Sequence, residues 1–226
     1  MTCWPVIDFH THSLLSDGVL TPAELGRRVQ VSGYAVLGLA DHADPGTLPG
    51  LIETARASAR ALNGHMEGLT ILPGVEITHV PPALIGDLVK KARDLGASHV
   101  VVHGETIVEP VRPGTNLAAI KAGADILAHP GLLTEEEAAL AAEKGIYLEL
   151  SARAGHSLAN GLTAQLALRF GAALLVNSDG HAPGDWLTPE RRRAVALGAG
   201  LDQTGYEALL AGAVRLAEVA QKRFDG

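Results

Sequence analysis

Short apolar runs alternate with amphipathic segments along this 226-residue chain, and that alternation restricts its fold more than any other feature. Most of the runs are continuous, for example Val-Leu-Gly-Leu-Ala at 36–40 and Ala-Leu-Leu-Val at 173–176. Continuous apolar strands are typical of a parallel sheet that is covered on both faces. We predict seven such strands, at Val6–His12, Val36–Ala43, Leu69–Val80, His99–Glu105, Ile126–Gly131, Tyr147–Arg153 and Ala173–His181.

The segments between these strands are predicted to be helices, because many begin with capping residues and end before glycines. Thr21 followed by Pro22 and Glu24 is the pattern of a helix N-terminus with a capping box. The remaining helices are predicted at Leu51–Asn63, Pro82–Leu95, Leu117–Ala122, Thr134–Lys144, Leu158–Phe170, Pro189–Leu197 and Tyr206–Phe224. Repeated strand–helix alternation implies right-handed crossovers and a parallel sheet, either a barrel or a doubly wound sheet. No linker or internal repeat interrupts the pattern, so we expect one domain over residues 1–226.

The charge balance and the single cysteine limit the partners and the compartment. Asp and Glu number 25 against 18 Lys and Arg, and the net charge of −7 argues against nucleic acid or an anionic membrane as partner. Cys3 is the only cysteine, so an intrachain disulfide is impossible and a reducing compartment is consistent. The first residues lack the basic start and apolar core of a signal peptide, and no run approaches about 18 apolar residues. We therefore expect a cytoplasmic protein.

Histidines and carboxylates follow the predicted strands at the point where each strand ends. His10 and His12 lie two residues apart on the first strand and therefore share one face of it. The full set has six histidines, two aspartates and one glutamate, namely His10, His12, Asp17, His42, Glu76, His103, His129, Asp179 and His181. Because the carboxyl ends of parallel strands meet at one mouth of a barrel, we expect these nine side chains to converge there.

This combination of side chains favours a metal centre. Imidazole nitrogens and carboxylate oxygens, with no sulfur, suit divalent ions such as Zn²⁺, Mn²⁺ or Fe²⁺. Nine ligands are too many for one ion, so two or three ions with a bridging carboxylate are expected. A single His-x-His motif is often only a pair of core or surface histidines. Six strands that each place a ligand at the same end are hard to explain without metal.

The same motifs, in the same order, resemble those of the PHP family, named for polymerase and histidinol phosphatase. The resemblance rests on His10-Thr11-His12, Asp17-Gly18, Ala40-Asp41-His42, Gly74-Val75-Glu76, Val102-His103, Ala128-His129-Pro130 and Ser178-Asp179-Gly180-His181. It implies a distorted seven-stranded (βα) TIM-like barrel with a metal site, usually of three ions, at the C-terminal mouth of the strands. It also implies three ligand groups, which are His10, His12, Glu76 and Asp179 for the first ion, Glu76, His103 and His129 for the second, and Asp17, His42 and His181 for the third.

The resemblance and the expected site together predict a metal-dependent phosphoesterase. The simplest form is a phosphomonoesterase for a small phosphorylated metabolite, similar to a histidinol phosphatase. Ions that share Glu76 would activate a water to hydroxide, which attacks phosphorus in line. Arg153, after the sixth strand, and Arg112, after the fourth, should face the mouth and bind phosphate. His156, in the loop after the sixth strand, is a candidate proton donor.

Two other functions remain open. A metal-dependent hydrolase of C–N bonds, as in the amidohydrolase superfamily, also has His-x-His after its first strand and a late aspartate. That superfamily usually has eight strands and often a bridging carboxylated lysine, whereas here Glu76 takes the bridging place and no lysine lies at a strand end. A noncatalytic metal-binding PHP module is the third possibility, and the complete ligand set argues against it. The residues predict neither the physiological substrate, nor the metal, nor the oligomeric state.

Overall fold

The structure is a computed structural model that describes residues 4–226, so Cys3 lies outside the described residues. Within residues 4–226 the chain forms nine β-strands, eight α-helices and one short 3-10 helix. The strands are β1 Val6–Thr11, β2 Tyr34–Leu39, β3 His42–Ala43, β4 Thr70–Pro73, β5 Val75–Ile77, β6 Val100–His103, β7 Ile126–Ala128, β8 Tyr147–Ser151 and β9 Leu174–Asn177. The helices are α1 Pro22–Val31, α2 Leu48–Leu62, α3 Pro82–Asp94, α4 Thr115–Ala122, α5 Glu135–Lys144, η1 His156–Ala159, α6 Asn160–Phe170, α7 Pro189–Gly198 and α8 Gln203–Asp225.

All pairings between these strands are parallel, as the alternating pattern predicts. One sheet has the order β1-β2-β4 and the other has the order β3-β5-β6-β7-β8-β9. Two predicted strands are each divided, into β2 and β3 at Ala40-Asp41 and into β4 and β5 at Gly74, which is why the strands number nine rather than seven within residues 4–226. Backbone hydrogen bonds bridge both interruptions, from Gly74 N to Leu39 O at 2.9 Å and from Glu76 N to Asp41 O at 3.1 Å.

Side chains complete the contact between the first strand and the last. An isolated parallel bridge joins Thr11 of β1 to Gly180, which lies just past β9. The Asn177 Oδ1 atom accepts a hydrogen bond from Phe9 N at 3.0 Å, and Asp8 Oδ1 accepts one from Ser178 N at 3.2 Å. The two ends of the strand series therefore lie side by side, and the residues just past β9 are brought against those at the end of β1.

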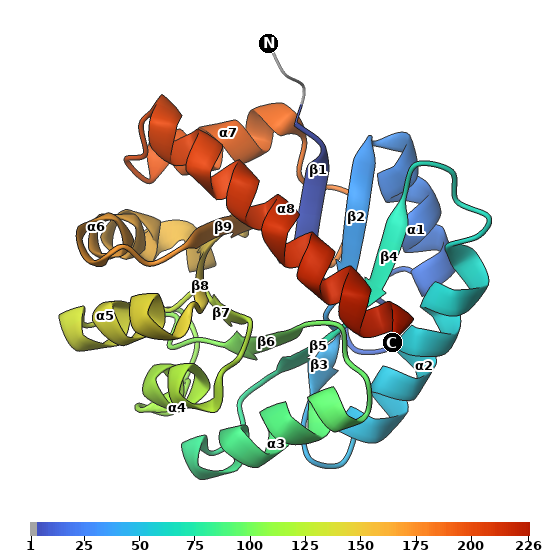
Figure 1. The fold of residues 1–226 in the computed structure, drawn as a ribbon, viewed down its shortest axis with the longest axis horizontal. Helices are drawn as coiled ribbons and strands as arrows, with labels where there is room; N and C mark the ends of the chain where they lie inside the picture. The colour runs from blue at the N-terminus through green and yellow to red at the C-terminus, as the bar shows by residue number, and fades with distance from the viewer. Residues whose placement is uncertain (1–3) are drawn as a thin grey trace.

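Two apolar clusters fill the structure on either side of the strands. The larger one packs the strands against the helices that surround them, and Figure 1 shows these helices as an outer layer. The smaller one contains inward residues of the strands, such as Phe9 and Leu72, together with Ala213, Leu216 and Ala220 of α8. The last helix crosses the strands near β1, β2 and β4 (Figure 1). It therefore covers the strand interior.

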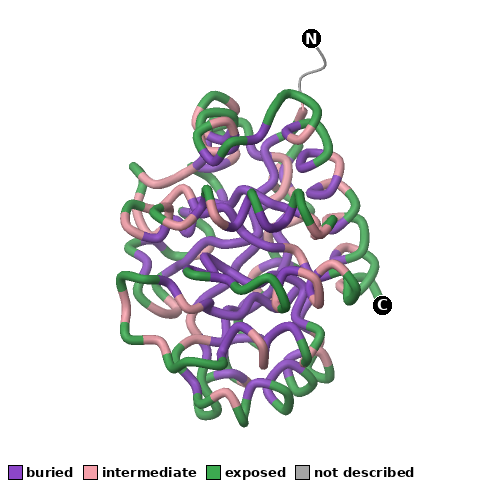
Figure 2. Tube along the Cα trace, turned by 90° about the vertical axis from the view of Figure 1, so that its left-hand side faces the viewer, coloured by how far each residue is buried: buried purple, intermediate pink, exposed green. Residues whose placement is uncertain are grey.

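The burial of the chain follows this layered arrangement. Figure 2 shows a buried central trace with the exposed residues on the outer turns of the helices and in the loops. None of the helices in the described part of the chain combines the length and the apolar character needed to cross a lipid bilayer.

The buried imidazole of His99 packs among the strands and limits the size of the side chains beside it. Its Nε2 atom donates to Phe9 O at 3.0 Å, and its ring packs edge-on against the Phe9 ring at 5.5 Å. Burial lowers the pKa of His99 to about 4, so the ring is neutral at pH 7. A Cβ atom at Gly74 would lie 2.4 Å from this ring. Glycine at the break between β4 and β5 is therefore required by the histidine that packs over it.

We expect Gly74→Ala to destabilise the protein by about 1–3 kcal/mol, because the added methyl overpacks a rigid core. For a chain of this size each kcal/mol lowers the melting temperature by about 2–4 °C. Gly86→Ala in α3 is the matched control, since nothing lies within 4 Å of the added carbon. This control should be neutral or slightly stabilising, because alanine is the better helix former. Thermal unfolding of both variants measures the difference. Equal melting temperatures would show that the His99 ring moves aside without a loss of stability.

Candidate metal centre

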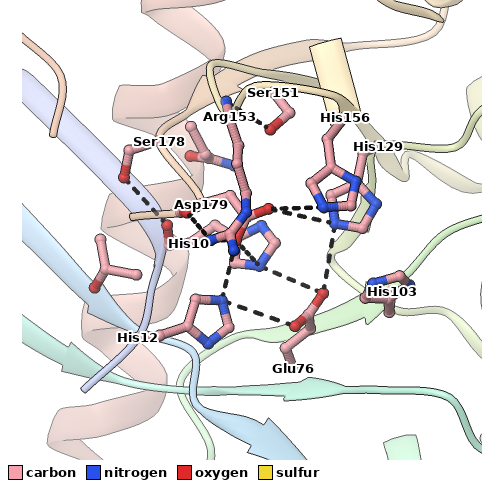
Figure 3. A network of polar contacts seen from close by, with 12 residues as sticks. His10, His12, Glu76, His103, His129, Ser151, Arg153, His156, Ser178 and Asp179 are labelled. Atoms are coloured by element: carbon pink, nitrogen blue, oxygen red, sulfur yellow. Dashed lines mark hydrogen bonds and ion pairs between the residues drawn. The ribbon is translucent and has the colours of Figure 1, made fainter. Parts of the chain in front are cut away.

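The nine side chains predicted as ligands come together at the C-terminal ends of the strands. His10 comes from β1, His42 from β3, Glu76 from β5 and His103 from β6, and His12 directly follows β1. The others lie in loops just past strand ends. Three groups of ligand atoms, each within 4.8 Å of one another, include all nine residues, and they are His12, Asp17, His42 and His181, then His10, His12 and Asp179, then Glu76, His103 and His129. Figure 3 shows the deeper members of these groups pointing toward a common centre.

Glu76 occupies the middle of this arrangement. Its carboxylate is fully buried and lies 2.6 Å from His42 Nδ1 and 3.4 Å from His10 Nε2. Contacts of 3.8 Å reach His12 Nε2 and His129 Nε2. One carboxylate thus faces four imidazoles from three different strand ends. This is the position required of a carboxylate that bridges two ions.

Asp17 forms the outer edge of the cluster. Its side chain is 56% exposed, and its Oδ1 atom lies 3.2 Å from His181 Nε2 and 3.4 Å from His42 Nε2. The loop that carries Asp17 is held by Asp41, which accepts hydrogen bonds from Ser13 N at 2.7 Å and from the Ser16 hydroxyl at 2.7 Å. Asp41, beside a predicted ligand, therefore anchors this loop.

Two members of the set have strained backbones. His129 has φ of 25° and Asp179 has φ of 51°, in the left-handed region that few non-glycine residues adopt. Such strain costs of the order of 1–3 kcal/mol and clusters at functional sites. The residue after Asp179 is held in place, because the Gly180 carbonyl accepts a hydrogen bond from His12 N at 2.9 Å. This bond helps to fix the conformation of Asp179. The surrounding structure therefore holds these two side chains in place at an energetic cost.

Several buried polar atoms of the cluster have no hydrogen-bond partner. They are His10 Nε2, both ring nitrogens of His12, Glu76 Oε1 and His129 Nδ1. Leaving a buried donor or acceptor unpaired costs about 1–3 kcal/mol, and native structures contain few such atoms. Five in one cluster, all nitrogen or oxygen, are a donor set that suits divalent ions such as zinc. The residues present therefore fit a group of divalent metal ions.

The electrostatics of the cluster agree with this chemistry. Burial holds the pKa of His12 and His129 well below the usual range, so these rings keep the lone pairs that a metal ion requires. Burial raises the pKa of Asp179 to about 7. Burial also opposes the charged form of His10, but Glu149, Glu76 and Asp179 outweigh it and raise the pKa of that ring well above normal. The buried carboxylates and imidazoles thus lie close together with no arrangement of protons that suits all of them. Bound cations would supply the positive charge that the carboxylates require.

Glu149 is a member of the cluster that the strand-end pattern missed. This fully buried residue of β8 accepts from His10 Nδ1 at 2.8 Å and from Asn177 Nδ2 at 2.9 Å, both on Oε2. The contact places the hydrogen of His10 on Nδ1 and turns Nε2 toward the other ligands, as carboxylates commonly do for metal-binding histidines. The signal was a lone charge inside the apolar run Tyr-Leu-Glu-Leu-Ser at 147–151.

Glu109 is the second missed residue, and it comes from the loop between β6 and α4. Its carboxylate contacts the imidazoles of His79, His103 and His156. The hydrogen bond from His103 lowers the pKa of Glu109 to about 2. An acidic residue in a polar loop carries no sequence signal that separates it from a solvated surface charge.

The three residues predicted to contact substrate have different surroundings. Arg153 is 34% exposed and donates to Asp179 O at 3.1 Å, and it also contacts His181. Figure 3 shows its guanidinium beside Asp179 and His10. His156 is buried, stacks on His129 with ring centres 4.2 Å apart, and bonds Thr106 Oγ1 through Nδ1 at 2.8 Å.

Arg112 is not brought to the site. It is exposed and does not line the cleft. Its carbonyl accepts from Thr115 N at 3.3 Å, in the turn where α4 begins. Glu105 also bonds within this loop, because its carboxylate accepts from Gly114 N and Asn116 N at the start of the same helix.

A cleft of about 440 Å³ opens over the cluster. Its volume is in the range of small-molecule sites. Most of the lining residues carry polar or titratable side chains, and beside predicted ligands they include Asp44, Thr47, Thr78, His79, Glu109, Arg153 and His156. The cleft can therefore receive a small polar molecule directly over the buried ligand cluster.

Solved structures share this fold at low sequence identity. A chain of archaeal ribonuclease P, solved with mature tRNA, has a TM-score of 0.69 at 17% identity, covering 96% of this chain and 92% of that one. Histidinol phosphate phosphatase from Lactococcus lactis, solved with zinc, L-histidinol and phosphate, has a TM-score of 0.63 at 16% identity, covering 87% and 94%. Amidohydrolases also share the fold. The molecule is therefore a parallel α/β protein of the TIM-barrel-like type, with a histidine-rich candidate metal centre.

Sequence comparison identifies the family. The chain is 45% identical over 201 residues to the uncharacterized protein MJ1295 of Methanocaldococcus jannaschii, covering 88% of this chain and 92% of that protein, and it belongs to the same family. A shorter match of 72 residues, at 43% identity, links it to the 3′,5′-nucleoside bisphosphate phosphatase of Chromobacterium violaceum. That match covers 32% of this chain and 22% of the phosphatase. No family model matches the sequence.

Proposed function

We propose that this protein is a metal-dependent phosphoesterase of the PHP type, most simply a phosphomonoesterase for a small phosphorylated metabolite. The observation that carries the proposal is the convergence of all nine nitrogen and oxygen ligands beneath one polar cleft. The partial match to a bisphosphate phosphatase and the shared fold of a histidinol phosphate phosphatase support the phosphate chemistry. The net charge of −7 favours a small substrate over nucleic acid. We also propose that residues 1–226 form one domain and that the protein acts in the cytoplasm.

We propose that the centre holds two or three ions of zinc, manganese or iron, divided among the ligands as the family resemblance implies. His10, His12, Glu76 and Asp179 would hold the first ion, Glu76, His103 and His129 the second, and Asp17, His42 and His181 the third. When bound, such ions supply Lewis-acid activation of the phosphoryl group and a nucleophile at neutral pH.

The chain's own residues bind and orient the substrate around this centre. Arg153 presents a guanidinium at the cleft, where its planar fork can hold two phosphate oxygens. His156 Nε2 lies 3.3 Å from Glu109 Oε1 and 3.9 Å from Asp179 Oδ2, so it faces the cleft. A hydrogen on that nitrogen is placed to reach a leaving oxygen. Glu149 keeps His10 in a single orientation through its 2.8 Å hydrogen bond.

We expect Arg153→Ala to raise KM for a phosphomonoester roughly 10- to 100-fold, since hydrogen bonds to charged groups contribute about 1.5–3 kcal/mol. The amount of bound metal should not change, because Arg153 is not a metal ligand. Arg112→Ala is the matched control, an exposed arginine outside the cleft, and should leave KM as in the wild type. Steady-state kinetics and elemental analysis of both variants provide the comparison. Identical kinetics for the two would make Arg153 a surface residue.

A C–N hydrolase is the second candidate, because amidohydrolases have the same fold. The cleft argues against this function, because no lysine is among its lining residues and Glu76 occupies the bridging place. A noncatalytic metal module is less consistent with a ligand set in which all nine members converge.

A pair of matched substrates tests the proposal. The metal-loaded protein is assayed with p-nitrophenyl phosphate and with p-nitroacetanilide, and bis(p-nitrophenyl) phosphate is added to separate monoesterase from diesterase activity. The proposal predicts release of p-nitrophenol from the monophosphate and no hydrolysis of the anilide. Cleavage of the anilide alone would identify a C–N hydrolase. Hydrolysis of none of the three by fully loaded protein would favour the noncatalytic module.

A further inference from the structure

Glu109 lies against the metal centre but is outside the nine-residue set. Its side chain is 36% exposed and projects from the loop between β6 and α4 into the wall of the cleft. The Oε2 atom lies 3.0 Å from His79 Nε2 and also 3.0 Å from His103 Nε2. The Oε1 atom lies 3.3 Å from His156 Nε2. Three imidazoles from three separate segments therefore converge on one carboxylate.

The orientation of the His103 ring shows what its Nε2 atom can do. Its Nδ1 atom lies 3.1 Å from Gly104 O, and because a carbonyl only accepts, Nδ1 carries a hydrogen. A hydrogen bond from Nε2 to Glu109 therefore requires a doubly protonated ring, whereas in the neutral ring the lone pair is on Nε2, which faces Glu109 Oε2 at 3.0 Å. Two lone pairs at this separation repel, so either a hydrogen or a cation must lie between them. A histidine that commits Nδ1 to a backbone carbonyl in this way is prepared to bind metal through Nε2.

The spacing of these atoms is close to that of ligands around one ion. Zinc binds nitrogen and oxygen at about 2.0–2.2 Å, which places two ligands of a tetrahedral ion roughly 3.3–3.6 Å apart. The 3.0 Å separation of Glu109 Oε2 and His103 Nε2 is a few tenths of an ångström shorter than this range. His79, His103 and Glu109 also offer ligand atoms that all lie within 4.8 Å of one another.

We propose that Glu109 is an additional ligand of the ion held by His103, and that His79 positions its carboxylate. This inference rests on the proposed function, which assigns an ion to His103 Nε2. The ion of Glu76, His103 and His129 would then have two histidines and two carboxylates. Glu109 comes from a loop at the cleft wall, so the fourth protein ligand of this ion is also its most exposed one.

Metal titration of the full chain tests this ligand. Metal-free protein is titrated with Zn²⁺ by calorimetry and with Co²⁺ followed by visible absorption, which reports the ligand set without any assay of activity. Glu109→Gln keeps the shape of the side chain and removes its charge. Asp44→Asn is the matched control, because Asp44 lines the same cleft but bonds only Gly46 and Thr47 of its own loop. His103→Ala removes the nitrogen on which the inference depends.

The expected result is a loss of affinity confined to one metal equivalent. Glu109→Gln should weaken that equivalent about 10- to 100-fold and change the Co²⁺ absorption, while Asp44→Asn leaves both unchanged. His79→Asn, which removes one imidazole from Oε2 and keeps the carboxylate, should weaken the same equivalent by a smaller factor. Unchanged affinity and absorption in Glu109→Gln, with an equivalent lost in His103→Ala, would overturn the role of Glu109 alone. Unchanged binding in His103→Ala would overturn both this inference and the assignment of the second ion.

Discussion

Glu76→Gln should abolish most of the activity and remove bound metal while the protein stays folded. The glutamine has the same shape, but it lacks the charge that faces His10, His42 and His129 from the centre of the cluster. Two of the assigned ions share this carboxylate, so the variant should bind at least one fewer equivalent than the wild type. Metal ions contribute several kcal/mol to transition-state stabilisation, and each 1.36 kcal/mol is tenfold in rate. We therefore expect a loss of phosphatase kcat/KM of roughly a thousandfold.

Elemental analysis and steady-state kinetics measure these two effects. Glu105→Gln is the control, because Glu105 is a half-buried carboxylate next to the same cluster that accepts only from the backbone amides of Gly114 and Asn116. It should lose some stability at the start of α4 and no metal. A Glu76→Gln protein with full metal content and wild-type kinetics would contradict the bridging position of this residue.

Removal of metal should lower the melting temperature of the wild-type protein by roughly 10 °C. An ion that binds only the folded state adds about 4 kcal/mol of stability at a thousand times its dissociation constant, and each kcal/mol corresponds to about 2–4 °C for a chain of this size. The buried atoms that lack partners, such as His10 Nε2 and Glu76 Oε1, explain why the ions should matter for stability. Thermal unfolding before and after dialysis against a chelator measures the shift.

Two controls define this shift. Adding Zn²⁺ back to the dialysed protein should restore the melting temperature, and Glu76→Gln should respond to the chelator less than the wild type. A melting temperature that does not change on treatment with chelator would mean that the cluster is stable as hydrogen bonds and ion pairs alone.

The strand-end positions of the candidate site could be predicted because they follow from topology. In a parallel α/β fold, residues at the carboxyl ends of strands share one edge whatever the details of packing. His103 and His129 illustrate this, since 26 positions in sequence separate them and their rings lie 4.4 Å apart. Local side-chain chemistry at such positions is therefore enough to propose a common site.

The remaining parts of the site depend on loop paths and on packing, which leave little trace in sequence. Arg112 and Glu109 lie in the same loop after β6, yet only Glu109 turns back into the cleft. Glu149 sits within a strand rather than at its end, and its importance follows from the nearness of β8 to His10 and Asn177. Packing at the break between β4 and β5 is equally hidden in the sequence, where His99 approaches Gly74 too closely for a Cβ atom.

The most direct test of the metal centre is the metal content of protein purified without chelator, with the same sample assayed on p-nitrophenyl phosphate. We expect two or three equivalents of zinc, manganese or iron per chain and measurable release of phosphate. A protein that contains no metal, and that takes up none after incubation with these ions, would contradict the assignment of the nine-residue cluster as a metal centre.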